Sequence, residues 1–132
     1  MGVLATLGFQ SFTASQKKAR DARRKSDLNQ IQKALELYKM DQQVWEYPNF
    51  DTTGDPESNT WALDFQPALQ SYMKEVPAES LPSSWGWPEY EYVRNDTLEY
   101  DLYVCLENED DPDQDAGDLC IDKGVSYTIT EP

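Results

Sequence analysis

The side chains whose types and spacing fit a recognisable chemistry are carboxylates near the C-terminal end of the sequence. Asp111, Asp113 and Asp115 alternate in ENEDDPDQDAGD, and Gly117 and Asp118 follow them. Calcium is held by about six to eight oxygen ligands, and alternate carboxylates converge on one ion where a glycine bends the chain. The stretch therefore predicts a calcium loop. Its ligands would be drawn from Asp111, Asp113, Asp115, Asp118 and Asp122, with backbone carbonyls completing the shell.

This spacing differs from that of an EF-hand, where the glycine directly follows the third ligand and a glutamate lies further on. Here Ala116 separates Asp115 from Gly117. The alternative interpretation is a solvated acidic loop that holds no ion. A bound cation is favoured because so many carboxylates on one short loop would otherwise repel one another.

Two cysteines, Cys105 and Cys120, enclose this acidic loop, and the chain contains no His. Two cysteines without histidine favour a disulfide over a metal pair, in keeping with small exported domains. Closing a loop of this length stabilises a protein by about 3 kcal/mol in the chain-entropy model. The alternative is a pair of free structural thiols.

The rest of the sequence lacks catalytic motifs. Without His it has neither the commonest general base nor the commonest metal ligand. It also has no Gly-rich phosphate loop, no GxSxG elbow and no HExxH. Carboxylates alone support some catalysis, but no constellation of them is evident. We therefore expect a protein that is not an enzyme.

Positive charge is concentrated in one segment of an acidic chain whose net charge is −14. Residues 41–132 hold three basic and 22 acidic residues, a net charge of −19. Such asymmetry indicates an interaction surface. Six cations lie within Ser15–Lys25 and are called the basic belt: Lys17, Lys18, Arg20, Arg23, Arg24 and Lys25. Within the belt, Asp21 and Lys25 are spaced for a helical ion pair.

The first forty residues predict one long helix, because no Pro precedes Pro48 and no Gly lies between Gly8 and Gly54. A helix over 3–41 would be roughly 57 Å long at 1.5 Å per residue, so its first half should project from a small head. An apolar stripe at spacings of three, four and three predicts the face that packs on the head. Its members are Leu28, Ile31, Leu35 and Tyr38.

Alternating apolar residues predict an antiparallel hairpin over 90–93 and 98–105 and a further strand over 125–130. The predicted fold class is therefore α+β, with a long N-terminal helix packed on a small antiparallel sheet of three or four strands. We expect two parts: a stem helix over 1–40, exposed in its first half and packed in its second, and a globular head over 41–132 that contains the acidic disulfide loop.

Shorter elements follow from turn residues. Pro, Gly, Asn and Asp make 42–60 a loop, and 61–65 reads as a turn. Pro67 suits the first position of a short helix that would run to about Lys74. LPSSWGWP is another loop, whose two Trp are expected to be lids on the core. The sequon Asn95-Asp96-Thr97 reads more simply as the hairpin turn.

One long stretch carries a resemblance to a known family. GVLATLGFQSFTASQKKARDARRKSDLNQIQKALELYKMD, followed by WEYP and YMKEVP, resembles type IV pilin-like proteins, especially major pseudopilins. In that family a longer apolar helix begins at a processed and methylated N-terminus and runs through a basic segment into the head. Gln42-Gln43 stands where the family has Asn-Gly, and the sequence does not contain the processing site and its Glu. The short apolar run is expected to continue a longer helix of a parent chain.

The resemblance implies a structural subunit of a type IV pilus-like or type II secretion pseudopilus filament that polymerises through its N-terminal helix. Its partners would be copies of itself in a helical homopolymer, the assembly machinery in the cytoplasmic membrane, and the membrane through the missing N-terminal segment. It implies a cell-envelope or extracellular filament and a membrane-bound precursor, whereas these 132 residues on their own are expected to be soluble. It also places a disulfide and a calcium loop before the last strand.

The basic belt would then meet the acidic head of a neighbouring subunit, or anionic lipid head groups before assembly. The alternative is a solvated helix face. A different class of function is a binding module, either a minor pilin that takes up DNA through the belt or an envelope adhesin that binds a surface ligand through its Trp-rich loops. The charge of the head repels nucleic acid and no aromatic side chain stands beside the belt, so nucleic acid is not an expected partner.

Overall fold

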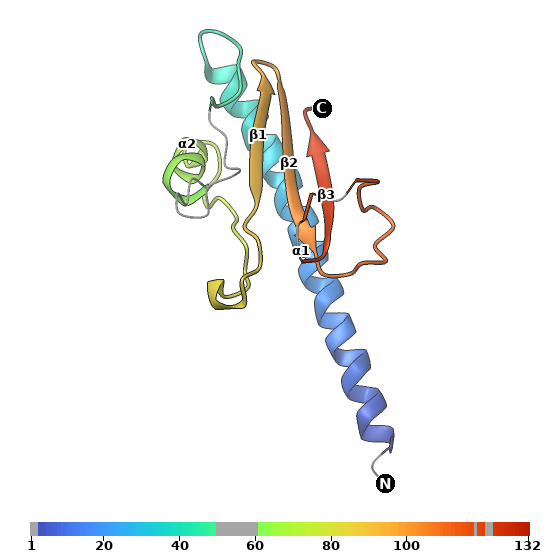
Figure 1. The fold of residues 1–132 in the computed structure, drawn as a ribbon. Helices are drawn as coiled ribbons and strands as arrows, with labels where there is room; N and C mark the ends of the chain where they lie inside the picture. Colours follow the sequence, from blue (N-terminus) through green and yellow to red (C-terminus); the bar gives the residue numbers. More distant parts are fainter. Residues whose placement is uncertain (1–2, 50–60, 118, 121–122) are drawn as a thin grey trace.

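A computed structural model describes residues 3–49, 61–117, 119–120 and 123–132 (Figure 1). It is an α+β fold in which one long N-terminal helix packs on a three-stranded antiparallel sheet, which confirms the predicted fold class at that level. The main elements are α1 (Val3–Asp41), β1 (Glu91–Asp96), β2 (Glu99–Leu106) and β3 (Val125–Thr130), and the strand order is β1-β2-β3.

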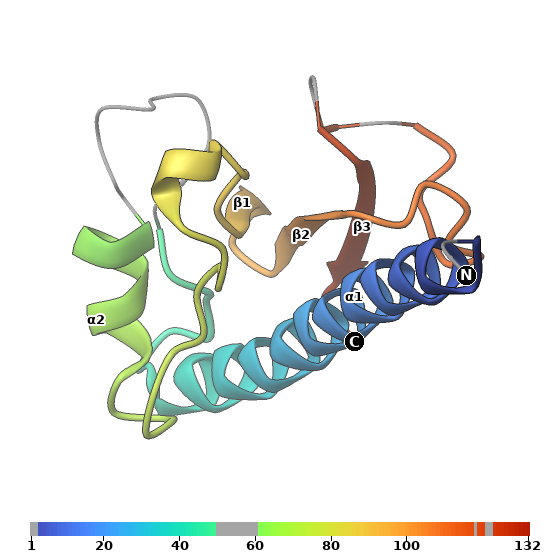
Figure 2. The ribbon, with the colours of Figure 1, turned by 90° about the horizontal axis from the view of Figure 1, so that it is seen from below.

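One face of the sheet lies toward α1, and the register of the strands shows which side chains share it. Leu102 of β2 lies opposite Tyr92 of β1 and Ile129 of β3, so these three side chains share a face. Figure 2 shows α1 running along that face. β3 has the predicted bounds, whereas the ends of β1 and β2 differ from the prediction by one to three residues. The register of β1 against β2 shifts between Arg94 and Asp96, where an extra residue lengthens β1.

The apolar stripe of α1 supplies its half of the core. Leu28, Ile31 and Leu35 are fully buried, together with Ala34. Tyr38, at the end of the stripe, is half-buried and meets Tyr72 edge-on with ring centroids 5.6 Å apart. The spacing of three to four residues places these side chains on one side of the helix, and burying an aliphatic side chain contributes about 1.5–3 kcal/mol.

The turn predicted over 61–65 is present as a π-helical turn, Trp61–Phe65, which runs into α2 (Gln66–Leu69). The short helix therefore begins one residue before Pro67, and the prediction that it would run to about Lys74 is wrong. Pro67 lies in the first turn of α2, where backbone N–H groups have no acceptor within the helix, so the N–H that proline lacks costs no helical hydrogen bond. A single 3₁₀ turn, Ser83–Trp85, lies in the loop predicted over LPSSWGWP. Of the predicted loop over 42–60, residues 50–60 lie outside the described part.

The first half of α1 projects away from the head (Figure 1). Every residue from 8 to 19 is exposed, including Phe9 at 71% and Phe12 at 59%. Within the described residues, none of the helices combines the length and apolarity that a membrane crossing requires. The projecting half thus has no covering partner among the described residues of its own chain.

Two leucines on α1 test the packing of the helix on the sheet. Leu35 is 0% exposed and Leu37 is 48% exposed, two residues apart on the same helix. Leu35→Ala should lower the free energy of unfolding by about 2–5 kcal/mol, because it opens a cavity in the core. Leu37→Ala has the same change in helix propensity and should cost less than about 1 kcal/mol. Urea unfolding measures both, and equal losses would contradict the packing described here.

Candidate functional site

Half of the basic belt binds the head of its own chain. The contacts form where α1 passes the segment that leaves β2. Arg20 donates to Glu107 twice, from Nε to Oε2 at 2.7 Å and from Nη2 to Oε1 at 2.9 Å. This two-point geometry is the one that a guanidinium group makes best with a carboxylate.

Arg24 is the most enclosed member of the belt, with its side chain only 2% exposed. Its Nε and Nη2 donate to Glu79 at 2.7 and 2.8 Å, and its Nη1 donates to both Asp21 and Glu107 at 2.8 Å. The guanidinium carbon also lies 5.1 Å from the centre of a Trp87 ring, a cation–π distance. Three carboxylates from three parts of the chain therefore surround one buried cation.

Asp21 completes this arrangement by binding the backbone of the head. Its Oδ1 accepts a hydrogen bond from the N–H of Glu107 at 2.9 Å, and its Oδ2 accepts one from the N–H of Asn108 at 2.8 Å. The stem thus holds both the side chain and the main chain at the exit of β2. The group is called the stem–head clamp, and its members are Arg20, Asp21, Arg24, Glu79 and Glu107.

The clamp shifts the pKa values of its members in the direction of an ionised network. Burial alone would raise the pKa of Glu107, but the hydrogen bonds from Arg20 and Arg24 hold it below its ordinary value of 4.5. Burial lowers the pKa of Arg24, but the hydrogen bonds that Arg24 donates to Glu79 and Glu107 more than offset that effect and raise the pKa. Both groups are charged at neutral pH, and each stabilises the charged form of the other.

Lys25 extends the contact into the acidic loop. Its Nζ lies 2.6 Å from Oδ1 of Asp111 and 2.7 Å from Oδ2 of Asp113. Burial would raise the pKa of Asp111, but Lys25 and the N–H of Asp113 hold it below its ordinary value of 3.8. The helical ion pair expected between Asp21 and Lys25 is not formed, because Asp21 binds Arg24 and the head instead.

Asp115 points in a different direction from the other two carboxylates. It accepts hydrogen bonds from the N–H and the hydroxyl of Thr128 at 3.1 and 2.7 Å, and its own N–H donates to the carbonyl of Ser126 at 2.8 Å. These contacts fasten the acidic loop to the outer edge of β3. They leave Asp115 without the freedom to converge with Asp111 and Asp113.

The described members of the predicted calcium set do not fit a calcium shell as they stand. Asp111 and Asp113 hold the Lys25 ammonium, and Asp115 holds β3. No group of three or more metal-ligating acidic or cysteine side chains converges anywhere in the described part of the chain. Asp118 and Asp122, the remaining predicted ligands, lie outside the described residues. Calcium binding therefore stays a prediction, and the ion would have to compete with Lys25.

Cys105 and Cys120 form a disulfide with a Cα–Cα distance of 5.8 Å. The bond joins the end of β2 to the chain that leads into β3, so it closes the acidic loop at its base. Both residues are buried. The disulfide thus closes the segment that carries Glu107, Asp111 and Asp113 into a loop, and the ion pairs with Arg20, Arg24 and Lys25 hold that loop against α1.

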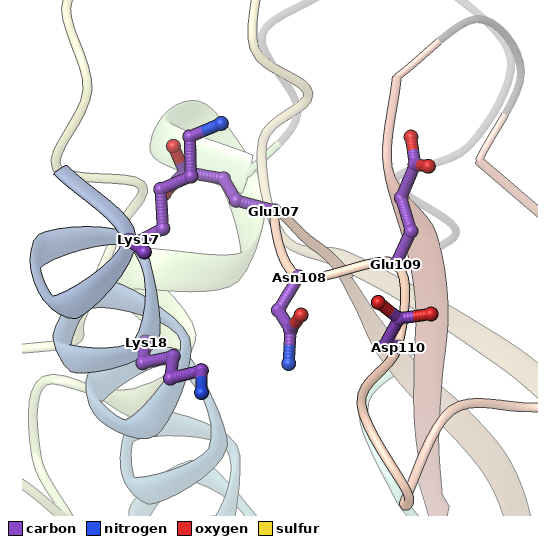
Figure 3. A pocket seen from close by; sticks show the side chains of 7 residues that line it. Lys17, Lys18, Glu107, Asn108, Glu109 and Asp110 are labelled. Carbon is purple, nitrogen blue, oxygen red and sulfur yellow. The ribbon is translucent and has the colours of Figure 1, made fainter. Parts of the chain in front are cut away.

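The other belt residues face solvent. Arg23 is largely exposed and lies 3.8 Å from Asp27. Lys17 and Lys18 are exposed and make no ion pair with any described residue. Figure 3 shows them on α1, across from the chain leaving β2, where they line a hollow of about 350 Å³ with Ala14 and residues 107–110.

The sequence interpretation missed most partners in the clamp. Glu79 and Glu107 lie 55 and 83 residues from Arg24 along the chain, so no local pattern connects them. The one local signal was the spacing of Asp21, Arg20 and Arg24 on adjoining turns of a helix. The Trp prediction was right only in part, because Trp87 is half-buried over Arg24 whereas Trp85 is exposed.

Comparison with known proteins does not assign this site to a family. No protein-family model, no curated protein and no solved structure matches the chain. The candidate site is therefore defined by its own geometry, as a charged junction that fixes the stem to the head and leaves the stem beyond it free.

Replacing Arg24 tests the clamp. Arg24→Met replaces the guanidinium group by an apolar side chain of similar length and leaves buried carboxylates without a cation. The free energy of unfolding should therefore fall by about 3–5 kcal/mol near neutral pH. Arg23→Met is the matched control on the neighbouring, exposed position, where an ion pair contributes less than about 1 kcal/mol. Similar losses in the two variants would show that Arg24 does not hold the head.

The same variant should respond differently to acid. The pKa of Glu107 is lowered in the folded wild type, so its contribution to stability is present above about pH 4.5 and is lost as pH falls through the folded pKa. Arg24→Met removes one of the two guanidinium groups that hold this pKa down, so the folded pKa of Glu107 rises toward its ordinary value and the variant loses less stability in acid. The difference in unfolding free energy between wild type and Arg24→Met should therefore stay constant above about pH 5 and shrink as pH falls below about 4.5. Denaturant titrations between about pH 5 and about pH 3 measure it, and a difference that stays constant over this range would contradict the coupling.

Replacing Lys25 tests which cation orders the acidic loop. Lys25→Met should lower the free energy of unfolding by roughly 1–2 kcal/mol, since it removes two charged hydrogen bonds at a partly exposed site. It also frees Asp111 and Asp113, so calcium should raise the melting temperature of the variant more than that of the wild type. Lys33→Met, on an exposed turn of the same helix, is the control. Thermal melting with chelator, calcium or magnesium measures this effect. If calcium raises the melting temperature equally in wild type, Lys25→Met and Lys33→Met, then Lys25 does not occupy the position of the cation.

Proposed function

We propose that this protein is a structural subunit of a type IV pilus-like or type II secretion pseudopilus filament, which polymerises through α1. The observation that carries the proposal is the free half of that helix. Every residue from 8 to 19 is exposed, while the second half of the same helix is built into the core. The pilin-like order of the apolar run, the basic segment and the KALELY stripe supports the proposal.

A helix in this situation gains stability from a partner. Isolated helices shorter than about 12–15 residues are marginal in water, and most helix stability in proteins comes from packing of an apolar face. Phe9 and Phe12 give the free half an apolar face that no described part of the chain covers. Association with other copies through this half would bury both rings.

A filament also needs a fixed geometry within each subunit. Head-to-tail contacts that do not close into a ring repeat the same rotation and shift at every step. In this proposal the stem–head clamp supplies that constancy, because it fixes the direction of the stem relative to the head through buried ionic contacts. The filament would lie in the cell envelope, with a precursor and its assembly machinery in the cytoplasmic membrane.

The distribution of the belt bears on the alternative functions. Arg20, Arg24 and Lys25 are engaged inside the chain, which leaves Lys17, Lys18 and Arg23 for other partners. A DNA-binding minor pilin would use all six cations, so this arrangement weakens that alternative. It also limits the direct role of the belt in assembly to its exposed members.

Tethered assembly tests the proposal. The chain, carrying an added N-terminal histidine tag, is bound to vesicles with a nickel-chelating lipid, which raises its local concentration to about the millimolar range. Lysine cross-linking should give an open ladder of oligomers, and Phe9→Ser with Phe12→Ser should suppress it. Gln10→Ala with Thr13→Ala, on the same turns, should leave the ladder unchanged. A chain that stays monomeric or stops at dimers on the vesicles would overturn the proposal.

A further inference from the structure

The hollow of about 350 Å³ beside the stem–head clamp carries opposite charges on its two sides (Figure 3). Lys17 and Lys18 lie on the α1 side, and Glu109 and Asp110 lie on the chain that leaves β2. These four side chains form no ion pair with any described residue. In Figure 3, Lys18 points into the space between helix and loop, and Asp110 lies across that space from it.

Contacts on α1 fix the loop side of this hollow. Asp21 accepts hydrogen bonds from the N–H groups of Glu107 and Asn108 at 2.9 and 2.8 Å. A few residues further along the loop, Lys25 binds Asp111 at 2.6 Å. The loop is therefore fastened to the helix on both sides of residues 109–110, and the hollow is formed before any ligand enters it. A preformed site loses less entropy when a ligand binds.

Asn108 adds a neutral polar group between the two charged sides. Its side chain is directed into the hollow (Figure 3), while its backbone N–H is held by Asp21. The side-chain amide forms no hydrogen bond with any described residue. An amide both donates and accepts hydrogen bonds, so it can serve either charged group of a ligand.

The opposite charges select a ligand that carries both signs. An anion bound to the lysines alone would be repelled by the acidic head, whose residues 41–132 have a net charge of −19. A metal ion at Asp110 would be repelled by Lys17 and Lys18, and no three acidic or cysteine side chains converge in the described part of the chain. A zwitterion complements both sides at once.

The residue types indicate a phosphate group and a primary ammonium group. Lysine is a common ligand of phosphate, and two neighbouring lysines can share its oxygens. A primary ammonium group has N–H donors for a carboxylate such as that of Asp110. A quaternary ammonium group has no such donor and is typically held by an aromatic cage, whereas none of the described lining residues is aromatic. Phosphoethanolamine combines the two groups that fit.

The stem gives a reason to assign this group to a lipid. Residues 2–16 contain no charged side chain, so Lys17 and Lys18 carry the first side-chain charges of the helix. The uncharged stretch from residue 3 to residue 16 is about 20 Å long, and Phe9 and Phe12 within it are exposed. The hollow thus lies where an uncharged stem meets a charged head. A bilayer would surround such a stem on all sides, with its head groups level with the hollow.

We propose that this hollow binds the phosphoethanolamine head group of a membrane lipid, with the phosphate at Lys17 and Lys18 and the ammonium group at Asp110. The inference rests on the proposed function, in which a precursor lies in a membrane, and it adds the class of lipid. The basic belt alone indicates anionic head groups. The acidic side of the hollow favours a zwitterionic head group instead.

The head group without acyl chains tests the hollow on the unassembled chain. Glycerophosphoethanolamine should shift the amide resonances of Asn108 and Asp110, with a Kd on the order of 1–10 mM because the charges are exposed. Glycerophosphocholine should bind several-fold more weakly, since its quaternary ammonium group donates no hydrogen bond. Asp110→Asn should weaken the binding of glycerophosphoethanolamine several-fold. Glu99→Gln, an equal change of charge on the exposed hairpin, should leave it unchanged. Equal binding of the two esters, or no saturable shift, would overturn the site.

Vesicles distinguish a lipid from a soluble ester. The chain should bind phosphatidylcholine vesicles several-fold more tightly when they contain phosphatidylethanolamine than when they contain phosphatidylglycerol. Asp110→Asn should abolish this preference, because the ammonium group loses its partner. A preference that persists in Asp110→Asn would come from the bilayer itself and would overturn the proposal. Binding of glycerophosphoethanolamine without a preference for phosphatidylethanolamine vesicles would overturn the assignment to a lipid.

These outcomes are separate from that of tethered assembly. Both measurements use the unassembled chain, and the tethered assembly needs no phosphatidylethanolamine in its vesicles. An open ladder of oligomers without head-group binding would overturn the ligand of the hollow and leave the filament proposal standing. Head-group binding without a ladder would overturn the filament proposal and leave the lipid site standing.

Discussion

The structure depends on one buried guanidinium. Removing a cation such as Arg24 from water costs several kcal/mol unless carboxylates and hydrogen bonds compensate for it. Here the compensation comes from Asp21 on the same helix, from Glu79 ahead of β1 and from Glu107 at the end of β2. Because all three must stay in place for the cation to remain buried, a local electrostatic requirement fixes the relation between the stem, the sheet and the segment between them.

The acidic loop follows the same logic on a smaller scale. A disulfide holds its two ends, Lys25 neutralises two of its carboxylates, and Asp115 binds the outward N–H and carbonyl groups of β3. An uncovered strand edge is a template for unwanted pairing between chains. By covering part of that edge, the loop leaves less of it open to such pairing, which in the proposed filament would favour association through the free helix. The acidity of the head therefore serves its internal order as well as any contact with a neighbour.

Local periodicity explains what could be predicted. Leu28, Ile31 and Leu35 follow a helical period that is visible in the sequence, and the alternation around Leu102 marks a strand, so the long helix and the sheet were accessible. The clamp was not, since Glu79 is distant in sequence and only the fold brings it to Arg24. The i,i+4 rule for helical ion pairs failed for the same reason. It pairs Asp21 with Lys25, whereas in the fold Asp21 binds Arg24 and the backbone of the head, and Lys25 binds the acidic loop. The predicted calcium ligands were chosen by their spacing, and a cation was expected from their mutual repulsion and from the family resemblance; none of these carries information on a cation supplied by another element.

The boundary within the basic belt has a physical consequence for assembly. Arg20, Arg24 and Lys25 of the belt are bound to the head, whereas Lys17 and Lys18, which precede them, are not bound to any described residue. The stem is therefore anchored up to the turn of Arg20 and free beyond it, so in the proposed filament the clamp would set both the direction of the stem and the length of helix that a neighbour would cover. Loosening the clamp would alter the angle between stem and head while Phe9 and Phe12 stayed unchanged. Since an open assembly repeats one rotation at every step, a small change of this angle would accumulate along the filament, and the clamp rather than the contact surface would decide its helical geometry.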